Sequence, residues 1–110
     1  MSGWTVRLAD RADQDIEEAL AWTLEHFGPL QLEIYADIIN AALEALNAGP
    51  HLPDVRKCPE LGDGIATLHV ARHGGKGRHL LVFFVDEAAC EVEILRVLHD
   101  SMDLARHLDS

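Results

Sequence analysis

Gly28 and Pro29 separate two stretches in which apolar residues recur every three or four positions. That spacing is typical of amphipathic helices and predicts one helix ending at Gly28 and another from about Pro29 to Asn47. Gly28 can adopt the left-handed conformation that ends a helix, and Pro29 lacks an amide hydrogen that a first helical residue does not need. So short a link predicts an antiparallel helical hairpin, which must bury its apolar stripe against another layer.

The two helical stretches also carry signals for their boundaries and buried faces. Asp10 or Asp13 can begin the first helix by accepting hydrogen bonds from its free amides. The apolar stripe of the first helix is Ile16, Leu20, Trp22 or Thr23, Leu24 and Phe27. The stripe of the second is Tyr35, Ile38, Ile39, Ala42, Leu43 and Leu46.

The remaining sequence supplies a sheet for the helices to cover. Apolar and polar residues alternate from Trp4 to Leu8, which predicts a first strand. Residues 50–64 read as an ordered loop with room for one helical turn. Three β-like runs follow, joined by connectors of hairpin length: Ile65–Arg72, His79–Val85 and Glu91–Leu98.

The order of these elements predicts one α+β domain over residues 1–110. The order is β-α-α-β-β-β, with the helical hairpin packed on a mostly antiparallel four-stranded sheet. A short helix or tail follows at the C-terminus. A chain of 110 residues is long enough to bury a core without a disulfide or a metal.

Charge is unevenly distributed along the chain. The formal net charge is −10, which argues against tight binding to nucleic acid, because phosphate recognition needs many Lys and Arg contacts. A local basic patch could still receive an acidic peptide. Its residues are Arg56, Lys57, Arg72, Lys76 and Arg78.

Membrane, metal and cofactor sites are not expected. No apolar run approaches the ~20 residues of a membrane span, and the first residues lack a signal-peptide pattern, so a cytoplasmic location is the expectation. His69 and His73 have a ligand-like spacing, but this spacing places two ligands together only on a helix. The Gly74–Gly77 loop lacks the spacing of a phosphate-binding motif.

The chain resembles the RelE/ParE superfamily of toxins from bacterial toxin–antitoxin pairs, in its ParE-like branch. The resemblance runs from Val6 to Leu108, and its most specific part is the closing strand with the run Arg96-Val97-Leu98-His99 and the following Asp103. The other matching pieces are VRLADRADQDIEEALAWTLEHFG, Tyr35 and ALEALNAGP. The resemblance implies a RelE/ParE-like fold and a toxin that is held silent by a cognate antitoxin.

Two activities occur in the superfamily, and the residues favour one of them. RelE-like members cut messenger RNA on the ribosome, with an Arg and a Tyr on the penultimate strand. Leu80 and Phe83 stand at those positions here. We therefore assign no catalytic residue and expect a ParE-like toxin of a plasmid stabilisation module, which inhibits DNA gyrase through protein–protein contacts. Two alternatives stay open: a RelE-like ribonuclease with a makeshift acid–base site of Arg78, His79 and His99, and a non-toxic binding module.

The resemblance also suggests which surfaces meet which partner. The polar tail is the expected gyrase contact, through Arg96, His99, Met102, Asp103, Arg106 and His107. The ordinary alternative is that Arg96 pairs with Glu91 or Glu93 on its own strand. The basic patch defined above is the expected contact for an acidic, partly disordered antitoxin tail. Either a homodimer or a toxin–antitoxin hetero-oligomer is compatible with the sequence.

Overall fold

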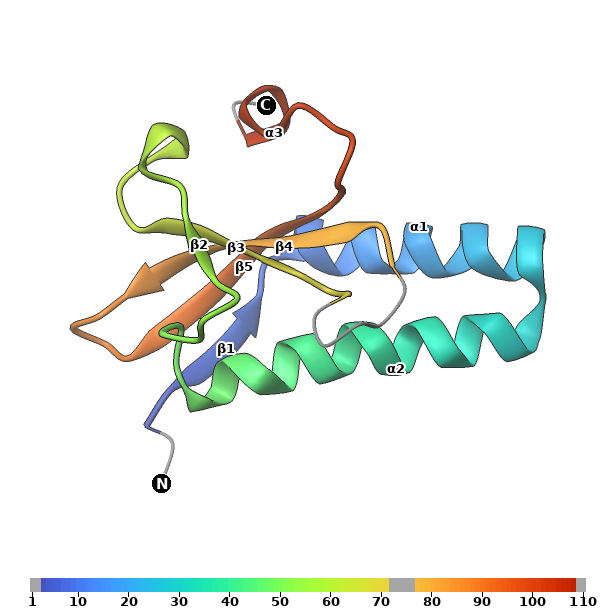
Figure 1. Cartoon of the computed structure of the whole chain (residues 1–110), viewed down its shortest axis with the longest axis horizontal. Helices are drawn as coiled ribbons and strands as arrows, with labels where there is room; N and C mark the ends of the chain where they lie inside the picture. Colours follow the sequence, from blue (N-terminus) through green and yellow to red (C-terminus); the bar gives the residue numbers. More distant parts are fainter. Residues whose placement is uncertain (1–2, 72–76, 109–110) are drawn as a thin grey trace.

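The computed structural model describes residues 3–71 and 77–108. A short first strand is followed by two long helices, then by the other strands and a short last helix (Figure 1). In chain order they are β1 (Thr5–Leu8), α1 (Asp10–Phe27), α2 (Pro29–Ala45), the 3-10 turn η1 (Leu46–Ala48), β2 (Arg56–Lys57), the 3-10 turn η2 (Pro59–Leu61), β3 (Ile65–His69), β4 (His79–Asp86), β5 (Glu91–His99) and α3 (Leu104–Leu108).

The strands form one sheet in the spatial order β1-β5-β4-β3-β2. β1 runs parallel to β5, and the other neighbouring pairs are antiparallel. The α+β class and the expected element order are therefore confirmed. The number of strands differs: the described residues contain five, because Arg56 and Lys57 pair with Thr67 and Ala66. Pairing with a distant strand cannot be inferred from two polar residues in a proline-rich segment.

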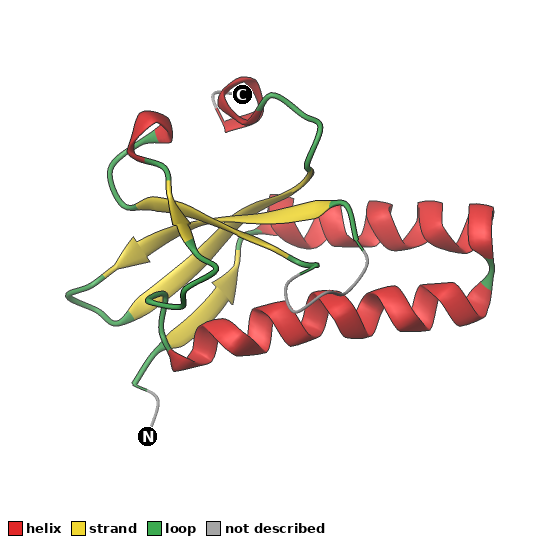
Figure 2. Ribbon diagram, in the orientation of Figure 1, coloured by secondary structure: helices red, strands yellow, loops and turns green. Residues whose placement is uncertain are grey.

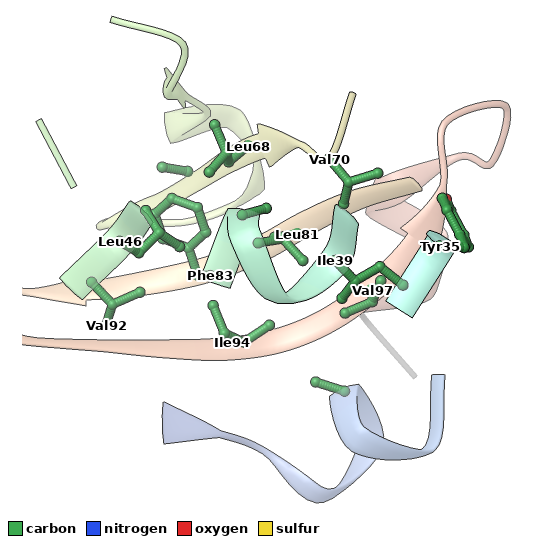
Figure 3. Packing of buried hydrophobic residues seen from close by; sticks show 13 residues of the cluster. Tyr35, Ile39, Leu46, Leu68, Val70, Leu81, Phe83, Val92, Ile94 and Val97 are labelled. Atoms are coloured by element: carbon green, nitrogen blue, oxygen red, sulfur yellow. The ribbon is translucent and has the colours of Figure 1, made fainter. Parts of the chain in front are cut away.

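The helical hairpin covers one face of the sheet, as Figure 2 shows. The predicted stripe of the second helix is confirmed, since Tyr35, Ile39 and Ala42 of α2 and Leu46 of η1 are buried. They pack on alternate residues of the strands, because successive strand side chains point to opposite faces. Figure 3 shows this cluster, whose labelled members from the strands are Leu68, Leu81, Phe83, Val92, Ile94 and Val97, with Val70 directly after β3.

The turn of the hairpin forms as the sequence predicts. Gly28 has φ +90°, and its amide donates to the carbonyl of Leu24 at 3.0 Å. Pro29 then opens α2. The low cost of positive φ for glycine explains why the chain reverses at this position.

The start of α1 differs from the prediction. Ala9 precedes the helix, and no side chain caps it, so neither Asp10 nor Asp13 has the expected capping role. The amide of Ala9 instead donates to the carbonyl of Ile94 at 2.9 Å. Hydrogen bonding to β5, the strand beside β1, fixes this boundary, a long-range contact that no local sequence signal reports.

The predicted stripe of α1 is only partly buried. Ile16 and Leu20 pack against the core, and Thr23 rather than Trp22 is the buried member of its turn. Leu24 and Phe27 are exposed. Within the described part of the chain, no helix has the length and apolar character needed to cross a membrane.

Candidate functional site at the end of the central strands

A β-bulge decides which side chains meet at one end of the sheet. The register between β4 and β5 shifts by one residue between Val82 and Phe83, where β5 contains the extra residue Leu95. A bulge of this kind re-aims the side chains that follow it. As a result, His79 at the start of β4 lies opposite His99 at the end of β5.

Tyr35 links the helical layer to this pair of histidines. Its hydroxyl lies 2.6 Å from Nδ1 of His79 and accepts the backbone amide of Arg78 at 3.2 Å. Burial raises the pKa of Tyr35, so the hydroxyl keeps its proton, and we assign it as the donor to Nδ1 of His79. Burial, followed by the nearby His99, lowers the pKa of His79. His79 is therefore a neutral imidazole with its proton on Nε2.

Asp100 joins the next two side chains. Its carboxylate accepts Nε2–H of His69 at 2.9 Å and Nε–H of Arg78 at 3.1 Å. The hydrogen bond from His69, helped by Arg78, lowers the pKa of Asp100. The amide of Ala71 donates to Nδ1 of His69 at 3.0 Å, which leaves the His69 proton on Nε2. Asp100 is thus a charged acceptor that holds His69 of β3 and Arg78, which directly precedes β4.

His99 completes the cluster. Its Nδ1 accepts the backbone amide of Ser101 at 3.2 Å and lies 2.7 Å from the Ser101 hydroxyl. The His99 and His79 rings meet edge to face, with centroids 5.5 Å apart. We call Tyr35, His69, Arg78, His79, His99 and Asp100 the histidine cluster.

The histidine cluster can transfer protons but is poorly equipped to hold a phosphate. Cleavage of RNA needs positive charge at the scissile phosphate. The charge of Arg78 is balanced by Asp100 at 3.1 Å, and the neutral His79 adds none. Among the described residues, no group of three or more His, Cys, Asp or Glu side chains is arranged to hold a metal ion; His73 lies outside those residues.

Arg96 has a partner on another element. Its Nε donates to Oδ2 of Asp15 at 2.8 Å and its Nη2 to Oδ1 at 3.0 Å. This hydrogen bonding raises the pKa of Arg96. The alternative pairing of Arg96 with Glu91 or Glu93 is therefore wrong. Only 12% of the Arg96 side chain is exposed, and its contact with a target stays a prediction.

The other residues of the expected gyrase contact lie on or near the tail. Met102 is 42% exposed, and Asp103 and Arg106 are also exposed. His99 is partly buried within the histidine cluster. The side chain of His107 lies outside the described residues. The exposed tail residues Met102, Asp103 and Arg106 are called the tail surface below.

The described residues of the basic patch lie on β2 and directly before β4. Arg56 and Lys57 are exposed on the edge strand β2, and Arg78 precedes β4 with 68% of its side chain exposed. Arg72 and Lys76 lie outside the described residues. A cavity of about 560 Å³ connects this region with the tail, because Arg56, His69, Asp103 and Leu104 all line it. Figure 1 shows α3 on the same side of the molecule as η2.

Three members of the histidine cluster were not proposed from the sequence as site residues: Tyr35, His69 and Asp100. Tyr35 reads as a core residue of α2, and it is indeed buried. Hairpin-length connectors indicate that the ends of the strands lie side by side, which would have suggested that His69, His79 and His99 share one end of the sheet. No spacing signal identifies Asp100 as their common partner.

Two solved structures resemble this fold over nearly all of their length. A chain of the chromosomal ParDE toxin–antitoxin system of P. aeruginosa matches with a TM-score of 0.71 and 17% identity, covering 90% of this chain and 98% of its own. A chain of the toxin–antitoxin complex RelBE2 of Mycobacterium tuberculosis matches with a TM-score of 0.60 and 25% identity, covering 90% and 93%. A comparison with curated proteins finds no match.

The sequence itself matches one protein family. The family is described as the ParE toxin of the type II toxin–antitoxin system parDE, and the match spans residues 6–104. This span includes the two long helices α1 and α2, the strands β2 to β5, all but the first residue of β1, and the complete histidine cluster. The chain therefore belongs to the ParE toxin family of type II toxin–antitoxin systems.

Proposed function

We propose that this ParE-family toxin inhibits DNA gyrase through protein–protein contacts made by the tail surface. A cognate antitoxin neutralises it, and the pair acts in the cytoplasm as a plasmid stabilisation module that restrains growth when the antitoxin is lost. The observation that carries the proposal is the contrast between two neighbouring regions. Met102, Asp103 and Arg106 are exposed, whereas the side chains best suited to chemistry are engaged with one another.

The electrostatics of the histidine cluster support a non-enzymatic mode of action. Asp100 balances the charge of Arg78, and the lowered pKa of His79 keeps that ring neutral. A polyanion that approaches the cluster would therefore meet little net positive charge. Recognition of a protein surface does not have this requirement, because apolar and hydrogen-bonding contacts can supply the affinity.

Neutralisation follows from the proximity of the two proposed surfaces. Arg56 of the basic patch and Asp103 of the tail surface line the same cavity. An acidic antitoxin segment that pairs with Arg56 and Lys57 would lie beside the tail and obstruct access to it. Binding of antitoxin and gyrase would then be mutually exclusive without any conformational change.

A gyrase supercoiling assay with purified protein tests the proposal. We expect inhibition by the wild type and a roughly tenfold higher inhibitory concentration for Met102→Glu combined with Arg106→Glu. Arg11→Glu, at an exposed arginine on α1, is the matched control and should inhibit normally. Absence of inhibition by the wild type would overturn the gyrase assignment.

Ribosome-dependent cleavage of messenger RNA is the second candidate, and the histidine cluster is the observation that favours it. His99 carries its proton on Nε2, because its Nδ1 accepts the amide of Ser101. Imidazole is the side chain that general acid–base catalysis uses most often. Cleavage by the wild type that is lost in His99→Ala would establish this activity. Normal growth at high expression without an antitoxin would instead indicate a non-toxic binding module.

A further inference from the structure

The turn after β5 brings a serine hydroxyl into contact with a histidine ring. Oγ of Ser101 lies 2.7 Å from Nδ1 of His99, and the backbone amide of Ser101 donates to the same nitrogen at 3.2 Å. Because an amide N–H can only donate, Nδ1 carries no proton and accepts both hydrogen bonds. The hydroxyl of Ser101 is therefore the donor, which is the arrangement of a serine nucleophile beside a general base.

Ser101 is held in place by backbone hydrogen bonds on both sides. The amide of Asp100 donates to the carbonyl of Arg78 at 2.7 Å, and the amide of Met102 donates to the carbonyl of His99 at 3.0 Å. The backbone thus positions the hydroxyl before any reactant arrives, which lowers the entropic cost of a reaction there. Ser101 is itself exposed, so a reactant can reach it from solvent.

The surroundings of His99 favour the protonated ring that such a reaction would create. Oδ1 of Asp100 lies 3.7 Å from Nδ1 of His99. The hydrogen bond from His69 lowers the pKa of Asp100, so its carboxylate is charged and stabilises an imidazolium beside it. On its other side, His99 meets the ring of His79 edge to face, with centroids 5.5 Å apart. Burial lowers the pKa of His79, so this ring brings no opposing charge.

The charges around the turn favour one kind of electrophile. Acidic residues flank Ser101 in the sequence at Asp100 and Asp103, and the guanidinium of Arg78 is paired with Asp100 at 3.1 Å. A phosphoryl donor carries several negative charges and would be repelled by these carboxylates. An uncharged acyl ester is not repelled, and the exposed side chain of Met102 offers its apolar part a contact.

We propose that Ser101 is an acylation site, at which His99 acts as the general base and an uncharged activated ester supplies the acyl group. Oγ of Ser101 forms a bond to the acyl carbon while its proton passes to Nδ1 of His99. The bond between the acyl carbon and the leaving oxygen then breaks, and the proton returns from Nδ1 to that oxygen. The products are an ester on Ser101 and the free alcohol of the donor. The site depends on the histidine cluster and the turn after it, so it is independent of the gyrase assignment.

Labelling of the full-length protein with p-nitrophenyl acetate tests the reactivity of Ser101. The chain has two other serines, Ser2 and Ser110, which serve as internal references in the same sample. Peptide mapping by mass spectrometry gives the initial rate of acetylation at each serine. We expect Ser101 to react roughly a hundredfold faster than the other two, which is the contribution of a positioned base. Equal rates at the three serines would overturn the proposal.

His99→Asn separates a general base from a structural hydrogen bond. The amide oxygen of asparagine can take the place of Nδ1 and accept the serine hydroxyl, but it cannot take up the proton. The rate of Ser101 acetylation should therefore fall to the level of Ser110. The matched control is His51→Asn, at a histidine with 61% of its side chain exposed, and it should keep the wild-type rate. Circular dichroism verifies that both variants are folded. An unchanged rate in His99→Asn would reject His99 as the base.

A solvent isotope effect on the wild type provides a measurement that needs no variant. Transfer of the proton from Oγ to Nδ1 is part of the acylation step, so Ser101 should be acetylated about twofold or more faster in H₂O than in D₂O. Equal rates in the two solvents would show that no proton is transferred in this step and would overturn the proposal.

Discussion

Asp15 of α1 and Arg96 of β5 form a two-contact ion pair across the edge of the sheet, with N–O distances of 2.8 and 3.0 Å. The same carboxylate accepts the backbone amide of Val97 at 2.9 Å. β1 pairs with β5 only as far as Ile94. Beyond that point Asp15 takes the place of a neighbouring strand, so it fastens the helical layer to the strand that leads into the histidine cluster.

Replacing Asp15 should therefore destabilise the folded protein strongly. Asp15→Ala leaves Arg96 without this partner and deprives the Val97 amide of its acceptor, in a site where the two side chains are 12% and 9% exposed. We expect the free energy of unfolding to fall by about 3–5 kcal/mol, as for other broken buried ion pairs. Urea denaturation followed by circular dichroism measures this loss.

An exposed ion pair on the same sheet provides the control. Arg7 lies 3.5 Å from Glu93, with 58% of its side chain exposed. Arg7→Met should cost less than about 1 kcal/mol. Similar losses for Asp15→Ala and Arg7→Met would contradict the structural role given to Asp15.

Tyr35→Phe tests the link between α2 and the histidine cluster. The variant keeps the ring in the core but removes the donor to Nδ1 of His79 and the acceptor for the Arg78 amide. We expect a loss of about 1–3 kcal/mol, because buried polar groups are left unsatisfied. We also expect the pKa of His79 to rise, since the hydrogen bond to Nδ1 favours the neutral ring.

Nuclear magnetic resonance titration of the His79 ring measures the expected rise of its pKa. Ile39→Val is the control, because it removes one buried methyl group at a position in the same helix and costs about 0.5–1.5 kcal/mol. Ile39→Val should leave the pKa of His79 unchanged. A His79 pKa that is the same in Tyr35→Phe and in wild type would contradict the inferred tautomer.

The stability of the protein should rise with pH through the His79 titration. Burial holds the pKa of His79 below 6.5 in the folded protein, so the unfolded chain binds more protons between the two values. The contribution of His79 is fully favourable above pH 6.5 and is lost as pH falls towards the folded pKa. Urea denaturation at a series of pH values from 5 to 8 measures the free energy of unfolding. Its increase with pH should be smaller in His79→Phe than in wild type. Equal slopes would contradict this assignment.

Asp100→Asn should loosen the start of the tail at neutral pH. The depressed pKa of Asp100 means that its contribution is present above pH 3.8, the usual value, and is lost as pH falls through the folded value. Hydrogen exchange of the Met102 amide, which donates to the His99 carbonyl at 3.0 Å, reports on this turn. We expect the Met102 amide to exchange faster in Asp100→Asn than in wild type at neutral pH. The difference between the two proteins should become smaller in acid. A difference that persists in strong acid would exclude the carboxylate as its cause.

Local sequence patterns are sufficient to predict the element order and the hairpin of the two helices. These features depend on local signals: the three- and four-residue spacing of apolar side chains, and the pairing of Gly28 with Pro29 at the turn. The closing strand was predicted as Glu91–Leu98, and the structure extends it by one residue to His99. The strand Arg56–Lys57 was missed, because its reason for being extended is the partner strand β3.

The pairing of the polar and charged side chains depends on the three-dimensional fold. The extra residue Leu95 shifts the register by one and places His99 opposite His79, and Asp15 rather than a strand neighbour holds Arg96. The exposure of Phe27 likewise depends on the lengths of helices and strands together. Each of these outcomes depends on contacts between residues far apart in the chain, whereas local sequence patterns report only on the conformation of near neighbours.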